Sequence, residues 1–166
     1  SIAKGEWERV VLLPSSVTRD ASEKLAAEQL FPGLEIRPLP KPGSENDADV
    51  CFRHFEAEIE RLRRDGFAQR DILVDFTRGT KAMSAALVLA AVAHELPHMR
   101  YITGSRDSRG MVVGGSEELR ETSPSQALAL RRLDGARHLV ERASFGAALE
   151  VLPDPDKPFT VLQLPR

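Results

Sequence analysis

Short runs of hydrophobic residues alternate with helical patterns along most of the chain. An apolar or β-branched run of about four to eight residues is typical of a strand, whereas hydrophobic residues that recur every three or four positions are typical of a helix. The runs that we expect to form strands are WERVVLL (7–13), LEIRPLP (34–40), DILVDF (71–76) and MRYIT (99–103). The segments that we expect to form helices are 21–30, 49–66 and 80–95.

The alternation of strands with helices predicts the fold class. Such a succession is the pattern of a right-handed α/β fold, and the unbroken apolar run in DILVDF is typical of a buried parallel strand. We therefore predict a Rossmann-like open, mostly parallel sheet flanked by helices. GMVVGG (110–115) is expected to add a fifth strand, for which an antiparallel direction stays open.

The pattern changes after residue 122. Leu133, Ala136 and Val140 recur at helical spacing, which predicts one or two helices outside the alternation, although a DG pair at 134–135 interrupts the segment. We expect a C-terminal helical extension, with PDPDKP as a linker and FTVLQL as a terminal strand.

These patterns divide the chain into two parts. Residues 1–122 are expected to form the Rossmann-like domain. Residues 123–166 are expected to be a helical linker or the start of a second module.

Composition and charge narrow the classes of partner. The 166 residues carry a net charge of -2 and a pI near 6.1, so no overall positive field attracts long nucleic acid. The most apolar window, 82–93, is too short to span a bilayer. The single cysteine, Cys51, excludes an internal disulfide, and SIAKGEWERV has no signal-peptide core. We therefore expect a cytoplasmic protein without a membrane partner, in which a local pocket holds any anionic ligand.

The stretch DFTRGTK (75–81) joins a predicted strand to a predicted helix. In open α/β sheets, ligands bind beyond the carboxyl ends of the strands, and unpaired N–H groups at the start of a helix attract phosphate or carboxylate. Glycine allows close backbone approach, hydroxyls donate hydrogen bonds, and arginine or lysine neutralises an anion. Neither GxxxxGK[ST] nor GxGxxG is present. The expected ligand contacts are Asp75, Thr77, Arg78, Gly79, Thr80 and Lys81.

The same corner also has a purely structural interpretation. Thr77 or Thr80 could cap the following helix, and Asp75 could accept local backbone hydrogen bonds. Lys81 favours a ligand, because the helix dipole disfavours a cation in the first turn unless an anion is shared between them.

Two other turns follow predicted strands at the same edge of the sheet. Ser15 and Ser16 come after the first strand, and Gly104 and Ser105 come after the fourth. Both pairs are candidate contacts to ribose or phosphate. The alternatives are that the serines cap the 21–30 helix and that TGSR is an ordinary surface loop.

The corner carries a resemblance to a known family. Asp75-x-Thr77-x-x-x-Lys81, extended as DFTRGTKAMSAAL, resembles the signature of CARF domains, the CRISPR-associated Rossmann-fold sensors, which commonly read DxTGGTKxM at this place. The order of the predicted elements is similar too, most of all to the CARF–HEPN ribonucleases of type III CRISPR antiviral systems. Two departures stand out: Arg78 replaces the usual glycine, and the family's first strand has no counterpart before VVLLPSS.

The resemblance implies a receptor for a cyclic oligoadenylate second messenger. A tetra- or hexa-adenylate ring would lie across a homodimer and regulate an attached effector such as a ribonuclease, through which alone RNA would be a partner. Two alternatives stay open. One is a ring nuclease that cleaves its own ligand, for which no general base is evident. The other is an unrelated nucleotide-binding α/β domain.

The C-terminal extension contains one more pattern. Arg132 and His138 fit the Arg–His spacing of HEPN ribonucleases, in which the histidine is the acid–base catalyst and the arginine stabilises phosphate charge. The interrupted segment is too short for the usual helical bundle, so we attribute the match to chance. No histidine pairs with cysteine or carboxylate at metal-ligand spacing. We predict no catalytic residue, no metal and no cofactor.

Overall fold

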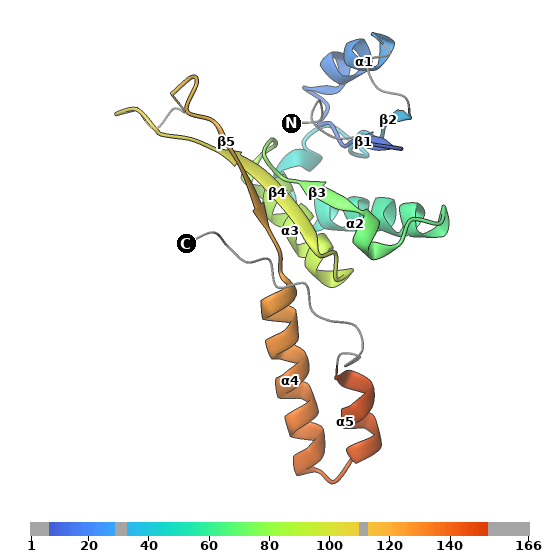
Figure 1. Cartoon of the computed structure of the whole chain (residues 1–166). Coiled ribbons are helices and arrows are strands. Elements are labelled where there is room, and N and C mark those ends of the chain that lie inside the picture. Colours follow the sequence, from blue (N-terminus) through green and yellow to red (C-terminus); the bar gives the residue numbers. More distant parts are fainter. Residues whose placement is uncertain (1–6, 29–32, 110–112, 153–166) are drawn as a thin grey trace.

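The computed structural model describes residues 7–28, 33–109 and 113–152, and within these ranges the chain is a mixed α/β protein (Figure 1). The strands are β1 (Val10–Leu12), β2 (Leu34–Ile36), β3 (Leu73–Asp75), β4 (His98–Thr103) and β5 (Glu118–Thr122). The α-helices are α1 (Arg19–Ala27), α2 (Ala48–Arg64), α3 (Lys81–Ala93), α4 (Ser125–Glu141) and α5 (Phe145–Val151). Two short 3-10 helices, η2 (Ser44–Asn46) and η3 (Gln69–Asp71), stand on either side of α2 in the chain.

Most of the strand pairs are parallel, which confirms the predicted fold class. β1 pairs in parallel with β2, β3 pairs in parallel with β4, and β5 runs antiparallel to β4. The strands form two small sheets, β1-β2 and β3-β4-β5, rather than the one open sheet that we expected. The ladder of β1 covers only three residues. Pro14 follows shortly after and has no N–H to donate to the ladder, and its main-chain oxygen accepts one further bond from Leu39 N at 3.0 Å.

The fifth strand lies later in the chain than the apolar pattern predicts. Residues 110–112 of GMVVGG are outside the described ranges, while 113–115 belong to a turn in which Ser116 N donates to Val113 O at 3.1 Å. Gly115 has a positive φ of 84° that suits such a turn. The strand itself is ELRET, a charged and mostly exposed sequence. Charged side chains protect an edge strand from pairing with other chains. Because β5 is charged, the pattern of apolar runs does not predict it.

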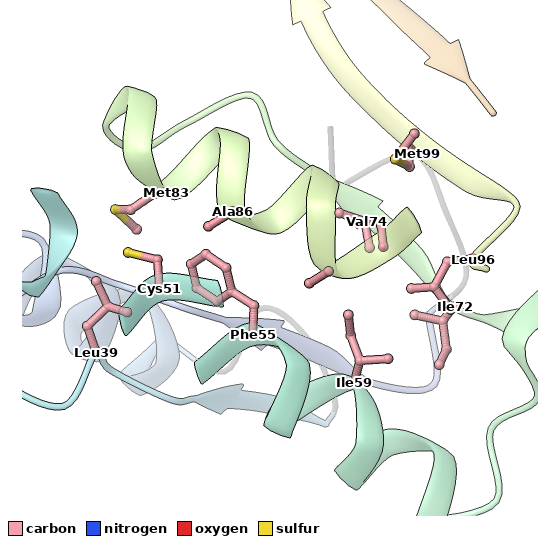
Figure 2. Close-up of a cluster of buried hydrophobic side chains, with 12 residues drawn as sticks. Leu39, Cys51, Phe55, Ile59, Ile72, Val74, Met83, Ala86, Leu96 and Met99 are labelled. Carbon is pink, nitrogen blue, oxygen red and sulfur yellow. The ribbon is translucent and has the colours of Figure 1, made fainter. Parts of the chain in front are cut away.

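The core is packed chiefly between α2 and α3 (Figure 2). Phe55 and Ile59 of α2 are buried, as their helical spacing predicts. Ala86 and Ala90 of α3 are fully buried as well, and their small side chains let the two helices approach closely. α2 begins at a cap in which Asp47 Oδ1 accepts hydrogen bonds from the N–H groups of two residues in the first turn.

One face of α3 remains exposed. Its composition predicts a helix buried all round, yet Ala85, Leu89 and Ala93 are exposed, Leu89 to 58%. These three residues are four positions apart and therefore form one stripe along the helix. Packing within the described part of the chain covers only the opposite face.

α4 and α5 form a helical hairpin that stands away from the α/β body (Figure 1). α4 runs unbroken through Asp134 and Gly135, so the expected interruption is wrong. A glycine inside a helix costs only about 1 kcal/mol, which the neighbouring helical hydrogen bonds and the packing against α5 offset. Arg132 of α4 forms an ion pair with Glu95, just after α3. The expected linker and strand at 153–164 lie outside the described residues.

None of the described helices has both the length and the hydropathy needed to cross a bilayer.

Candidate functional site

Asp75, at the end of β3, organises the turn into α3. Its Oδ1 accepts hydrogen bonds from Thr77 N at 3.0 Å and from Thr77 Oγ1 at 2.5 Å. Its Oδ2 accepts from Arg100 Nε at 3.1 Å. Asp75 therefore has the local role that the structural interpretation assigned to it, and it also joins β3 to β4.

Thr77 makes a second link between the two strands. Its Oγ1 accepts a hydrogen bond from Ile102 N at 2.9 Å, while its single hydroxyl proton is directed to Asp75. The N–H of Phe76 donates to Arg100 O at 3.1 Å. We call Asp75, Thr77, Arg100 and Ile102 the strand-end clasp. Thr77 has no second proton to offer a ligand.

Arg100 is the member of the clasp that sequence analysis missed. Only 7% of the residue is exposed, and its guanidinium lies between the Asp75 carboxylate and the ring of Trp7, 5.1 Å from the ring centroid. A buried charge requires a partner, and Asp75 provides it. A signal was present, because Arg100 is the one charged residue in the apolar strand MRYIT.

Thr80 is the N-cap of α3. Its Oγ1 accepts a hydrogen bond from Met83 N at 3.2 Å and donates to the main-chain oxygen of Glu45 in η2. The second threonine hydroxyl of the corner is thus also used within the protein. The polar loop before α2 therefore also contacts the start of α3, which its sequence did not indicate.

Backbone amides are the donors that remain at the corner. The N–H groups of residues 78–82 have no hydrogen-bond partner within the described ranges, and the cap of Thr80 serves only Met83. Gly79 has a φ of 112°, which an L side chain rarely adopts, and an added Cβ would lie 3.1 Å from the Met83 Cβ. The glycine therefore shapes a row of consecutive amides at a helix start, which favours an anion.

Two cationic side chains flank these amides. Arg78 and Lys81 are exposed, and neither forms an ion pair or a side-chain hydrogen bond with another described residue. An unpaired cation beside the positive end of a helix dipole is unfavourable without an anion. The corner can accordingly bind a phosphate or carboxylate through main-chain donors and two positive charges.

The other predicted contacts are held in their own turns. Ser15 is buried, and its N–H donates to Thr18 Oγ1 at 3.1 Å in the turn before α1. The N-cap of α1 is Thr18, and no side chain makes a cap hydrogen bond there, so the interpretation of the two serines as caps of this helix is wrong. Ser16 is exposed. Gly104 and Ser105 belong to the β4–β5 connection, where Ser105 O accepts from Val113 N at 2.8 Å. No hydrogen bond or ion pair between described residues joins either pair to the corner.

Titratable groups elsewhere in the described ranges were also candidates for chemistry. Within the described ranges, no three His, Cys, Asp or Glu side chains cluster as metal ligands. Arg132 is paired with Glu95, whereas His138 lies 3.6 Å from Glu141. Six residues of helix place Arg132 and His138 on different faces, so they do not converge on one ligand.

Comparison with known proteins identifies no relative from which the function of the site could be inferred. No protein-family model matches the chain, and no curated protein matches it.

Proposed function

We propose that this chain is a cytoplasmic CARF-type sensor domain that binds a cyclic oligoadenylate across a homodimer. The observation that carries the proposal is the row of open amides at 78–82, flanked by Arg78 and Lys81, which have no partner among the described residues. A ring of adenylates presents phosphates at regular intervals, and phosphate is one of the anions that helix starts bind.

The exposed stripe of α3 supports the dimer. Lys81, Ala85, Leu89 and Ala93 are spaced four residues apart, so the cation stands at the head of an apolar stripe. Two chains that paired along this stripe would form an isologous contact. The two copies of Lys81 would then face the same two-fold axis, where a symmetric ring can contact both.

The residues of the motif divide into two groups in this proposal. Asp75, Thr77 and Thr80 shape the turn, because their polar atoms are bonded within the protein. Arg78, Gly79 and Lys81 contact the ligand or make room for it. Arg78 adds a phosphate contact where other members of the family have glycine. The ring then acts on an attached effector, such as a ribonuclease.

Isothermal titration with cyclic tetra-adenylate, cyclic hexa-adenylate and AMP tests the proposal. We expect one ring to bind per two chains with micromolar or tighter affinity. Lys81→Ala should weaken binding about tenfold or more, because a charge-assisted contact is lost. Lys24→Ala, which removes an exposed lysine of α1, is the matched control and should leave affinity unchanged.

Three other results have defined meanings. Absence of heat with both rings overturns the proposal. Binding of one AMP per chain would instead favour an unrelated nucleotide-binding domain. Linear products with a cyclic-phosphate end, found by chromatography after incubation with the ring, would show that the chain cleaves what it binds.

A further inference from the structure

The α4–α5 hairpin has an open apolar groove of about 410 Å³. Phe145 and Leu149 of α5 are 61% and 73% exposed, and Leu133 of α4 is 58% exposed. Among the described residues that line the groove, all are hydrophobic except Arg137. They are Leu133, Ala136, Arg137, Val140, Phe145, Ala148, Leu149 and Leu152.

A hairpin with this exposure needs a covering element. α5 has only seven residues, and helices shorter than about 12 residues are marginal in water without tertiary packing. Of the described side chains of α4 and α5, Ala136 and Ala148 alone are buried. Clustered large apolar side chains on a surface mark an interaction site.

The position of the following segment identifies a suitable occupant. The chain leaves α5 at Leu152, which itself lines the groove. The next six residues are PDPDKP, and a proline-rich linker of this length spans about 19 Å at roughly 3.1 Å per residue. α5 is about 10 Å long. Residues 159–164 can therefore reach every part of the groove.

The chemistry of that segment also fits. FTVLQL contains four large apolar residues, Phe159, Val161, Leu162 and Leu164, and no charge. Asp154 and Asp156 precede it and would add negative charge near Arg137, which lies 3.6 Å from Glu141 at the groove.

A second copy of the hairpin fits less well. It would bring another Arg137 to the same groove, together with the exposed Arg131 of another α4. A covalently linked segment also has a high effective concentration that a second chain lacks. We propose that residues 159–164 of the same chain bind the α4–α5 groove and complete its apolar packing.

Disulfide trapping in the full chain tests this inference. In a Cys51→Ala background, Leu149→Cys combined with Leu162→Cys should form an intrachain disulfide under mild oxidation, which non-reducing electrophoresis and peptide mass mapping detect. Glu150→Cys with Leu162→Cys is the matched control, because Glu150 is exposed but does not line the groove. We expect the groove pair to cross-link at least about fivefold faster than the control pair.

Equal rates for the two pairs would overturn the inference. Predominantly interchain cross-links would overturn it as well and would show that a second copy covers the groove. If the cysteine variants fail to fold, a second measurement still tests the inference. Phe159→Asp with Leu162→Asp should speed hydrogen exchange of the α5 amides about tenfold or more and leave α2 unchanged. Unchanged exchange in α5 would also overturn the inference.

Discussion

Asp75 accepts hydrogen bonds from Thr77 and Arg100 at the end of β3, and these bonds determine which groups of the corner remain for a ligand. Its two oxygens are bonded to Thr77 and Arg100, so the carboxylate is paired. An anion that approaches residues 78–82 meets N–H groups and cations with the nearby negative charge already neutralised by Arg100. Charge pairing at the clasp thus reduces the electrostatic repulsion that the Asp75 carboxylate would exert on an anion at the turn.

Gly79 is the residue at which a substitution should disturb the turn between β3 and α3 most. Gly79→Ala should lower the free energy of unfolding by about 1–2 kcal/mol, because alanine at φ 112° is strained and its Cβ crowds the Met83 side chain. Urea denaturation followed by circular dichroism measures the change.

Gly114→Ala is the control for this prediction. Gly114 has no positive φ and no heavy atom within 4 Å of an added Cβ, so its substitution should change stability little or slightly raise it. Equal losses in the two variants would contradict the account of the turn.

At the scale of the element, α2 is joined to the β1-β2 sheet by charged groups as well as to α3 by the core. Arg61 lies 2.8 Å from Glu58, 3.1 Å from Glu35 of β2 and 3.4 Å from Asp65. Burial alone disfavours the charged guanidinium, but the hydrogen bond to Glu58 and the surrounding carboxylates outweigh it, and the pKa of Arg61 is raised. Arg61 is therefore the centre of a charge network that holds the first sheet against α2.

Replacing Arg61 should accordingly destabilise the protein in a salt-dependent way. Arg61→Met is expected to lower the free energy of unfolding by about 1–2 kcal/mol at low salt, because three carboxylates lose a shared cation. The loss should shrink in 1 M salt, where the Debye length is only about 3 Å. Denaturant titrations at the two salt concentrations measure it. Arg63→Met, on the exposed side of α2, should show little change, and a loss equal to that of Arg61→Met would contradict the prediction.

Cys51 connects α2 to η2, and its thiol makes the free energy of unfolding depend on pH. The thiol is fully buried and donates to Ser44 O at 3.1 Å. Burial, helped by the negative charges of Asp47 and Glu45, raises its pKa above the ordinary value of 9.0. The folded protein thus holds this proton more tightly than the unfolded chain. The resulting stability is complete below pH 9.0 and is lost as pH rises through the folded pKa.

Two measurements follow for Cys51. Reaction with a disulfide reagent at pH 8 should be about 100-fold or more slower in the native protein than in urea, because the native thiol is protonated and inaccessible. Denaturation at pH 8 to 11 should show that Cys51→Ala loses less stability with rising pH than the parent. A native thiol that reacts as fast as the unfolded one would contradict both statements.

At the scale of the whole molecule, the sequence predicts what depends on neighbouring residues and misses what depends on distant ones. The helical spacing of Phe55 and Ile59 identified α2 and its buried face. The candidate corner was found because its turn, glycine and cations are consecutive in the chain. Its supports were missed: Arg100 is 25 residues from Asp75, and Glu45 is 35 residues from Thr80. No local pattern encodes such contacts.

α3 is one of the elements that connect the corner to the rest of the molecule. It begins at Lys81 and is followed directly by Glu95, which is paired with Arg132 of α4. The helix is about 20 Å long, and a packed helix moves as a stiff rod because its hydrogen-bonded turns resist bending. A ligand that tilted the Lys81 end would thereby pull on α4 at the other. The ion pair between Glu95 and Arg132 would then transmit this movement from α3 to α4. The stronger the ion pair is, the more closely the C-terminal hairpin would follow α3.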